Sequence, residues 1–232
     1  MASYGETDLL YANPLASADD VADWSLEGDA AVTFPRERMR LENVDDPEAV
    51  DEPHYVYWCP ERFPDGIKVS WDFWPLREPG LCMLFFAATG RNGADVFDPE
   101  LDERTGVYSQ YYDGDIDTLH VSYFRRNHHG EPKHEIQFQT VNLRKSKGFD
   151  LVQRGGDPIP GVRDANGPYR IAVVKDGPRV AFSVDGLEVL EWVDDGESHG
   201  PVYEGGAVGF RQMAPTIGEY ADLTVHAVER TD

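Results

Sequence analysis

The sequence predicts an all-β protein, an antiparallel β-sandwich of jelly-roll type. Apolar and polar residues alternate over short segments, as in IKVSWDFW at residues 67–74, which is the pattern of a half-buried strand. Hairpin turn signals separate such segments, among them KDGP at residues 175–178 and Asp185-Gly186. Many short strands with turns at roughly regular spacing are typical of a sandwich.

About a dozen strands are expected along the chain, and helical signals are weak. Residues 81–88, LCMLFFAA, form a continuous apolar run suited to a central strand. Two short helices are expected, at residues 17–22 and 47–50, and a long acidic loop is expected at residues 90–106. The other strands expected with most support lie at residues 67–74, 119–124, 134–140, 169–192 (three strands), 206–213 and 219–228.

We expect a single domain over residues 1–232, with residues 1–23 as a peripheral N-terminal segment. The N-terminal stretch lacks the basic and apolar regions of a signal peptide, and no apolar run is long enough to span a membrane. These features predict a cytoplasmic protein. The cysteines, Cys59 and Cys82, favour two buried thiols over a disulfide.

The chain is strongly acidic, with 43 acidic and 21 basic residues and a net charge of −22. Nucleic acid and anionic membranes are excluded as general partners, because phosphate contacts need a basic surface. Adaptation to high salt would explain the excess, since molar salt screens the repulsion between like charges. An ordinary acidic protein is the alternative.

Positive charge gathers in one window, residues 118–148. Six basic residues stand there against Glu131 and Glu135, which makes the window +4; they are Arg125, Arg126, Lys133, Arg144, Lys145 and Lys147. A basic patch in a repelling chain suits an anionic ligand. For the residues from Arg144 to Lys147, a solvated turn is an equally good interpretation.

Strand alternation predicts which side chains face away from the core. In residues 119–124, Leu119, Val121 and Tyr123 form the apolar, inward set. The residues expected to face outward are His120, Ser122, Phe124, Arg126, Glu135, Gln137, Gln139, Arg211, Met213, Asp72 and Trp74, with either Tyr111 or Tyr112.

This outward set suits a sugar lying in a groove across one sheet. Aromatic rings stack on pyranose faces, while amide and guanidinium groups bind hydroxyls and carboxylates directionally. The alternative is a solvated sheet face that happens to be polar. The predicted substrate-binding residues are Trp74, Asp72, Ser122, Arg126, Gln139 and Arg211.

Several long motifs resemble the YesU-like family. They are HVSYFRR, NLRKSKGF, GRNGADVFDPELDERTG, PYRIAVVKDGPRVAFSVD and GFRQMAP, and the resemblance extends from about residue 24 to residue 228. It implies a concanavalin-like jelly roll and a link to polysaccharide degradation, because the family is named for a member associated with rhamnogalacturonan utilisation. No catalytic residue can be carried over from a family without an established mechanism.

The residue types fit a lyase acting on an acidic, uronate-containing oligosaccharide by β-elimination. Arginine or glutamine would neutralise the carboxylate, and histidine or tyrosine would transfer the proton. Arg211 is expected to recognise the carboxylate and Arg126 to serve a distal subsite. The catalytic candidates are His120, Gln137, Tyr112 and Glu135.

Two other functions remain open. The first is a non-catalytic carbohydrate-binding or accessory protein on the same fold. The second is a glycoside hydrolase, which needs two carboxyl groups and could use Glu135 with Asp72.

No metal or cofactor is expected. The histidines lack zinc-site spacing. Residues 113–117 begin like a calcium loop, but Thr118 stands where that loop needs glycine, so calcium is a minor alternative. The oligomeric state is not predicted.

Overall fold

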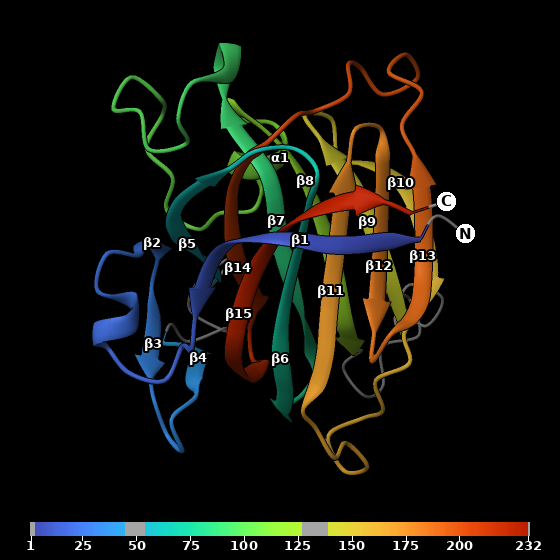
Figure 1. Cartoon of the computed structure of the whole chain (residues 1–232). Coiled ribbons are helices and arrows are strands. Elements are labelled where there is room, and N and C mark those ends of the chain that lie inside the picture. Colours follow the sequence, from blue (N-terminus) through green and yellow to red (C-terminus); the bar gives the residue numbers. More distant parts are fainter. Residues whose placement is uncertain (1–2, 45–53, 127–138, 232) are drawn as a thin grey trace, which may run out of the picture.

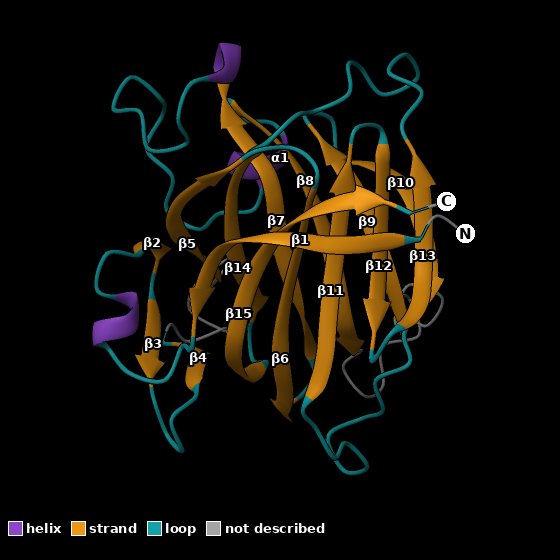
Figure 2. Cartoon of the chain, in the orientation of Figure 1, coloured by secondary structure: helices purple, strands orange, loops and turns teal. Residues whose placement is uncertain are grey.

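The computed structural model describes residues 3–44, 54–126 and 139–231 as two antiparallel sheets packed face to face (Figures 1 and 2). The described residues form fifteen strands and three short helical turns. The predicted antiparallel β-sandwich is therefore confirmed. No helix in these three segments is long and apolar enough to cross a membrane.

The front sheet faces the viewer in Figure 1 and has the strand order β13-β12-β11-β6-β15-β4-β3, with β1 paired to β15. Sequence neighbours β11, β12 and β13 form the meander that the two hairpin turns predict. The strands of this sheet are β1 (Tyr4–Asn13), β3 (Ala30–Thr33), β4 (Met39–Asn43), β6 (Ile67–Arg77), β11 (Tyr169–Asp176), β12 (Arg179–Val184), β13 (Leu187–Val193) and β15 (Ile217–Arg230).

The back sheet has the order β10-β9-β8-β7-β14-β5-β2. The continuous apolar run at residues 81–88 lies in β7, between β8 and β14, as a central strand should. The strands of this sheet are β2 (Ser25–Gly28), β5 (His54–Phe63), β7 (Gly80–Gly90), β8 (Ile116–Arg126), β9 (Thr140–Ser146), β10 (Asp150–Gly156) and β14 (Gly206–Met213).

The helical segments are single turns: η1 (Asp19–Val21), η2 (Arg91–Gly93) and α1 (Ser109–Tyr112). The first lies within the helix expected at residues 17–22. The helix expected at residues 47–50 and most of the strand expected at residues 134–140 lie outside the described residues.

Aromatic side chains fill the core between the sheets. Trp71 and Phe73 of β6 meet Tyr123 of β8 and Phe210 of β14, with ring centroids 5.3 Å apart for Phe73–Tyr123 and 5.5 Å for Trp71–Phe210. All four are fully buried, and edge-to-face packing of this kind adds to the free energy gained by burial. The inward alternation predicted for β6 and β8 places these rings correctly.

Cys59 and Cys82 are buried free thiols, which confirms that prediction. Burial raises the pKa of Cys59 to about 11 and that of Cys82 to about 12. Both side chains belong to the core between the sheets and behave there as small apolar groups.

A second, smaller apolar cluster covers part of the outer face of the back sheet. Tyr111 of α1 and Val96 of the long acidic loop pack with Trp58 of β5 and Phe85 of β7. Tyr111 donates a hydrogen bond to Glu27 on β2 at 2.8 Å, and Arg104 of the loop donates to the same carboxylate at 2.7 Å, which ties both α1 and the loop to the sheet edge. The loop thus closes one part of the face that was expected to be open.

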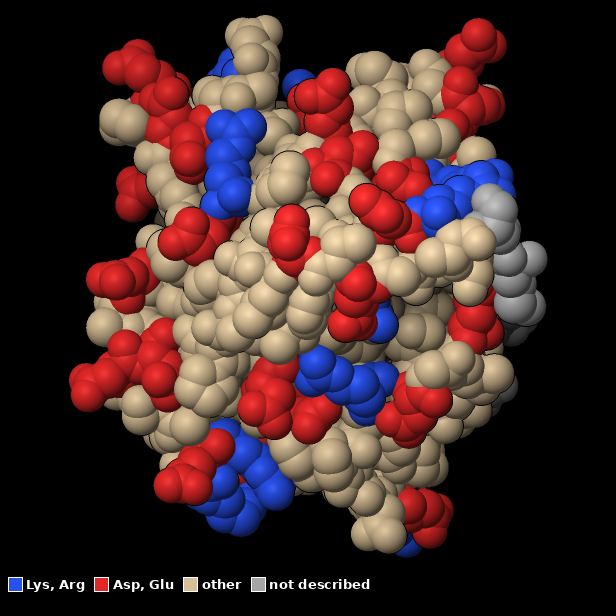
Figure 3. Space-filling view, in the orientation of Figure 1, with Lys and Arg blue, Asp and Glu red and all other residues tan. Residues whose placement is uncertain are grey.

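Charges are distributed unevenly over the surface. Figure 3 shows acidic side chains spread across the front face, whereas lysine and arginine gather there in a few groups. Each of these basic groups has acidic neighbours in the picture. A high-salt adaptation stays a prediction.

Candidate functional site

Strand β8 contains a bulge that changes which side chains face outward. Phe124 has φ +47°, and the pairing of β7 with β8 shifts register nearby. Phe124 turns into the core against Phe73, with ring centroids 5.8 Å apart, so the prediction that it faces outward is wrong. Arg125 is the residue that lies on the His120 side beyond the bulge, within electrostatic reach of Tyr108 and Arg144.

Arg126, which was expected beside His120, is held at the core side instead. Its guanidinium pairs with Asp157 at 2.8 Å and approaches Glu78 at 3.8 Å. It also lies over the Phe124 ring at 4.5 Å and donates to the carbonyl of Ile159. The expectation that Arg126 shares a face with His120 is wrong, because the extra residue of the bulge reverses the alternation after Tyr123.

His120 lies on the predicted outer face of β8 but is only 1% exposed. Its Nε2 atom is 2.8 Å from the hydroxyl of Tyr108, and its ring packs against Phe85 at 5.1 Å. Burial, reinforced by Arg144 and Arg211, lowers the pKa of His120 to about 3. The imidazole is therefore neutral at ordinary pH, and the half-buried Tyr108 is the member of the pair that solvent reaches.

Three arginines surround this tyrosine–histidine pair. Arg144 of β9 is the direct cross-strand partner of His120, and its guanidinium stacks on Phe149 at 3.8 Å. Arg211 of β14 is fully buried, donates to the Gly106 carbonyl at 2.8 Å and lies 4.8 Å from the centre of the Tyr108 ring. We call Arg125, Arg144 and Arg211, with Tyr108 and His120, the arginine cluster.

The electrostatics of the arginine cluster favour an anion. Burial raises the pKa of Tyr108 to about 12, although the three arginines oppose the shift. Burial, together with repulsion from Arg144 and Arg154, lowers the pKa of Arg125 to about 10. Cations that repel one another in a partly desolvated site would be stabilised by a bound negative charge.

Asn142 adds a neutral polar group beside the cluster. It lies on β9, pairs with Ser122 of β8 and is almost fully buried. With its amide oriented to satisfy both ends, its oxygen accepts a hydrogen bond from Arg125 at 2.9 Å. Ser122, which was expected to face outward with His120, is the strand partner of Asn142 but is buried.

The two tyrosines of α1 have different positions. Tyr111 is buried in the smaller apolar cluster, whereas Tyr112 is half-buried with its ring 4.7 Å from Phe149 and 5.3 Å from Tyr108. Tyr112 is thus the one beside the arginine cluster.

Gln139 is exposed at the bend before β9, where its backbone N–H donates to the Arg125 carbonyl at 2.9 Å.

Two predicted catalytic residues, Glu135 and Gln137, lie outside the described residues.

Two predicted binding residues lie on the wrong sheet for a shared groove. Asp72 and Trp74 belong to β6 of the front sheet, where Asp72 pairs with Arg170 at 3.3 Å and the Arg38 guanidinium covers the Trp74 ring at 3.7 Å. The expectation of one groove that contains them together with His120 is wrong, because alternation assigns a side of a strand and not a sheet.

Three members of the site were missed from the sequence. The outward direction of Arg144 could have been predicted from alternation along β9, where Val141 and Leu143 point into the core. Arg125 depends on the bulge, which has no clear sequence signal. Tyr108 lies just before α1 in an irregular segment, so periodicity says nothing about its direction.

The basic residues of the window at residues 118–148 lie in two different environments. Arg125 and Arg144 belong to the arginine cluster, whereas Lys145 points to the opposite side of β9 and is fully buried. Its Nζ donates to Asp194 at 2.6 Å, to the Gly200 carbonyl at 3.1 Å and to the Pro201 carbonyl at 2.7 Å. The solvated-turn interpretation is therefore wrong for Lys145.

Residues 113–117 resemble the start of a calcium loop, but their central acid, Asp115, is hydrogen-bonded to other protein groups. Asp115 accepts hydrogen bonds from the Asp102 backbone N–H at 2.7 Å and from Arg91 at 3.0 Å. Within the three described segments, no group of three or more His, Cys, Asp or Glu side chains could hold a metal ion. That no cofactor is needed stays a prediction.

Comparisons with known proteins agree with this architecture. The chain is an all-β sandwich similar to a crystal structure titled as a protein of unknown function with galectin-like fold from Bacillus subtilis, with TM-score 0.92, 51% identity, and coverage of 99% of this chain and 100% of that one. It belongs to the family described as a domain of unknown function (DUF1961), whose model matches residues 8–225.

A curated relative is the uncharacterized protein YesU of Bacillus subtilis (strain 168), 51% identical over 227 residues, which are 98% of this chain and 99% of the relative. The resemblance to the YesU-like family is thereby confirmed. A carbohydrate-binding module, CBM66 from Bacillus subtilis, shares the fold at TM-score 0.53 and 15% identity, over 88% of this chain and 94% of that one.

Proposed function

We propose that the protein binds acidic, uronate-containing oligosaccharides at the arginine cluster and cleaves them by β-elimination. The observation that carries the proposal is the Tyr108–His120 hydrogen bond of 2.8 Å, set among three guanidinium groups. A proton-transferring pair beside cations is what elimination next to a carboxylate requires.

The cluster supplies carboxylate recognition in a chain that otherwise repels anions. The net charge of −22 disfavours anion binding over most of the surface, so a site with several cations stands out. Arg144 is half-buried, whereas Arg211 and Arg125 are buried beneath the face, so Arg144 is best placed to meet the ligand. Guanidinium groups bind carboxylates through two parallel hydrogen bonds, and neutralising the carboxylate makes the adjacent C5 proton more acidic.

Tyr108 takes the role that the sequence suggested for His120. In the proposed step, Tyr108 passes its hydroxyl proton to Nε2 of His120 and its oxygen removes the C5 proton. The C5–H electron pair forms the C4=C5 double bond, the C4–O bond breaks, and the leaving oxygen takes the proton from Tyr108. The imidazolium then returns the first proton to Tyr108, so the enzyme is restored.

Substrate binding itself would prepare His120 to accept that proton. Burial comes first among the causes that lower its pKa, and Arg144 and Arg211 add to the effect. A carboxylate bound beside these arginines offsets their repulsion of an imidazolium, so the pKa of His120 should rise in the complex. The unliganded value of about 3 thus describes the resting site.

The second candidate function is a carbohydrate-binding protein without catalysis. The burial of His120 and its low pKa favour this alternative, because a resting histidine of that kind is a weak base. The fold likeness to a carbohydrate-binding module is compatible with it but cannot distinguish binder from enzyme. A hydrolase pairing Glu135 with Asp72 has less support, since the Asp72 carboxylate is paired with Arg170 at 3.3 Å.

The deciding experiment is incubation with a panel of acidic oligosaccharides, beginning with galacturonate-containing fragments of rhamnogalacturonan, to which the family resemblance points. Absorbance of the unsaturated uronate product and fragment masses are followed together. Elimination gives fragments whose masses sum to that of the parent, whereas hydrolysis adds one water. Saturable binding without fragments would establish the binding alternative.

Tyr108→Phe tests the assigned role, because it removes the hydroxyl and keeps the ring. We expect turnover to be abolished while oligosaccharide binding stays within about tenfold, or ~1.4 kcal/mol. Tyr112→Phe is the matched control on the neighbouring ring and should keep turnover. A Tyr108→Phe protein with the activity of the wild type would refute the mechanism.

A further inference from the structure

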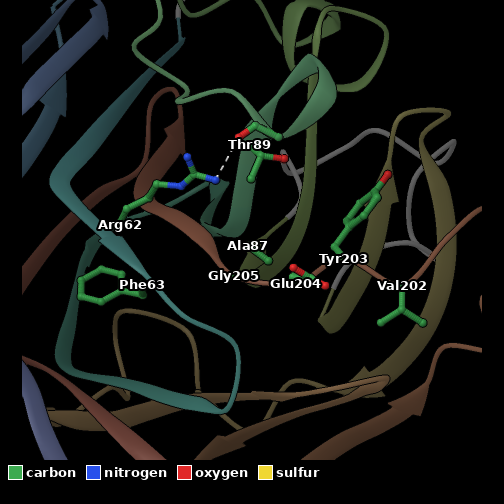
Figure 4. Close-up of a pocket in the computed structure, with 9 residues that line it drawn as sticks. Arg62, Phe63, Ala87, Thr89, Val202, Tyr203, Glu204 and Gly205 are labelled. Atoms are coloured by element: carbon green, nitrogen blue, oxygen red, sulfur yellow. Dashed lines mark hydrogen bonds between the residues drawn. The ribbon is translucent and has the colours of Figure 1, made fainter.

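A cavity of about 310 Å³ opens at one end of the sandwich, away from the arginine cluster (Figure 4). It lies over the start of β14, between the ends of β5 and β7 and the segment that precedes β14. Figure 4 shows Arg62 and Phe63 on one side, Val202 and Tyr203 on the other, and Gly205 between them. Its volume is at the lower end of the range of small-molecule sites.

The walls of this end cavity are held in place by contacts beneath it. A Cβ at Gly205 would lie 2.1 Å from the Phe63 carbonyl oxygen, so only glycine allows this close approach of backbones. The Tyr203 hydroxyl donates to the Ser146 carbonyl at 2.9 Å. The Lys145 Nζ donates to the carbonyls of Gly200 and Pro201, which precede Tyr203 in the chain. The cavity is therefore preformed and does not require a loop to order on binding.

The polar groups of the end cavity include both hydrogen-bond donors and acceptors. The exposed Arg62 uses one N–H for the Gly93 carbonyl at 3.1 Å, which orients a guanidinium that has four more N–H groups. Glu204 is exposed and supplies a carboxylate, and Thr89 supplies a hydroxyl. Because the charges of Arg62 and Glu204 cancel, neither an anion nor a cation is favoured.

Apolar surface completes the lining. The half-buried Val202 and Tyr203 contribute carbon atoms beside these polar groups, and the buried Phe63 and Ala87 add small exposed areas. A molecule with hydroxyls that both donate and accept, and with an apolar C–H face, matches this mixture. That description fits a neutral pyranose.

We propose that the end cavity is a binding site for one neutral sugar unit, which goes beyond the proposed action on acidic oligosaccharides. On β7, Phe85 is the partner of His120, and Thr89 lies four residues further on, or at most ~13 Å along the strand. The end cavity and the arginine cluster therefore lie at different positions along the back sheet and share no residue. A substitution that abolishes binding at the end cavity should leave the arginine cluster functional, and the reverse should also hold. Each site can therefore be tested separately.

The test is an NMR titration of the whole protein with methyl glycosides of glucose, galactose and mannose. We expect saturable binding of at least one of them. Arg62→Ala and Glu204→Gln, both at exposed positions, should each weaken that binding at least about tenfold, or ~1.4 kcal/mol. Arg144→Ala, the matched control in the arginine cluster, should leave neutral-sugar binding unchanged.

Three outcomes would overturn the proposal: no saturable binding of any of the three glycosides, undiminished affinity in both Arg62→Ala and Glu204→Gln, or affinity lost only in Arg144→Ala. Each variant must melt at the wild-type temperature. Cleavage of acidic oligosaccharides by Arg62→Ala is measured in parallel and should match the wild type, so failure at the arginine cluster is distinguishable from failure at the end cavity.

Discussion

Lys145 offers the sharpest test of how the basic window stabilises the fold. Its Nζ makes three hydrogen bonds in a fully buried position, the shortest to Asp194 at 2.6 Å, and the Asp194 side chain is only 4% exposed. Lys145→Met keeps the apolar stem and removes the charge. Because Asp194 is then a buried carboxylate without its cation, the free energy of unfolding should fall by about 3–5 kcal/mol.

Urea unfolding and thermal melting measure this loss. For a chain of this size, ~3–5 kcal/mol corresponds to a decrease in melting temperature of roughly 6–20 °C. Lys147→Met is the matched control, since Lys147 is exposed two residues away and should change stability by less than ~0.5 kcal/mol. The double variant Lys145→Met/Asp194→Asn should recover much of the loss, because no uncompensated charge remains.

A decrease below ~1 kcal/mol in Lys145→Met would refute the reasoning, since that is the size expected of an exposed ion pair. A double variant as unstable as Lys145→Met alone would show that the lost hydrogen bonds to the Gly200 and Pro201 carbonyls, and not the unpaired carboxylate, dominate. Both comparisons are made at one salt concentration, because the chain carries a net charge of −22.

Three further predictions concern the dependence of stability on salt, its dependence on pH, and the reactivity of the thiols. If the acidic surface is adapted to high salt, the melting temperature should fall as salt is lowered from molar to millimolar; a flat or opposite trend would exclude the idea. Burial acts to raise the pKa of Glu219, but hydrogen bonds from Arg36 and Arg40 outweigh it and lower the pKa below 4.5. The stability that Glu219 contributes is therefore present above pH 4.5 and lost as pH falls through the lowered pKa. Glu219→Gln should accordingly be less stable than the wild type at neutral pH, by urea unfolding, and the gap should close in acid; a constant gap would contradict the assignment. The thiols of Cys59 and Cys82 should react with a thiol reagent only after unfolding, because burial raises their pKa values; fast reaction of the native protein would show local opening.

The sequence by itself determined the side of each regular strand on which a residue lies. Residues 67–73 and 119–123 alternate, and their apolar members Trp71, Phe73 and Tyr123 meet in the core. This follows because successive side chains on a strand point to opposite faces, and one face must bury apolar surface. His120 was placed on the outer face of its strand for the same reason.

The tertiary structure alone decided which strands share a sheet and where alternation breaks. Asp72 and His120 both face outward, yet they lie on opposite sheets, because β6 pairs with β15, which is far along the chain, whereas β8 pairs with β7 and β9 of the back sheet. One residue at φ +47°, Phe124, places Arg125 instead of Arg126 on the His120 side of β8. Neither fact leaves a periodic trace in the sequence.

The position of Tyr108 and the burial of Lys145 were likewise beyond local inference. Tyr108 is brought over His120 by an irregular segment, whose path depends on packing against Trp58 and Phe85. Lys145 reads as a solvated cation in its sequence neighbourhood, but its partner Asp194 is 49 residues away. Local patterns determine the side of a strand, whereas partners distant in the chain determine burial and charge pairing, because those depend on the complete set of long-range contacts.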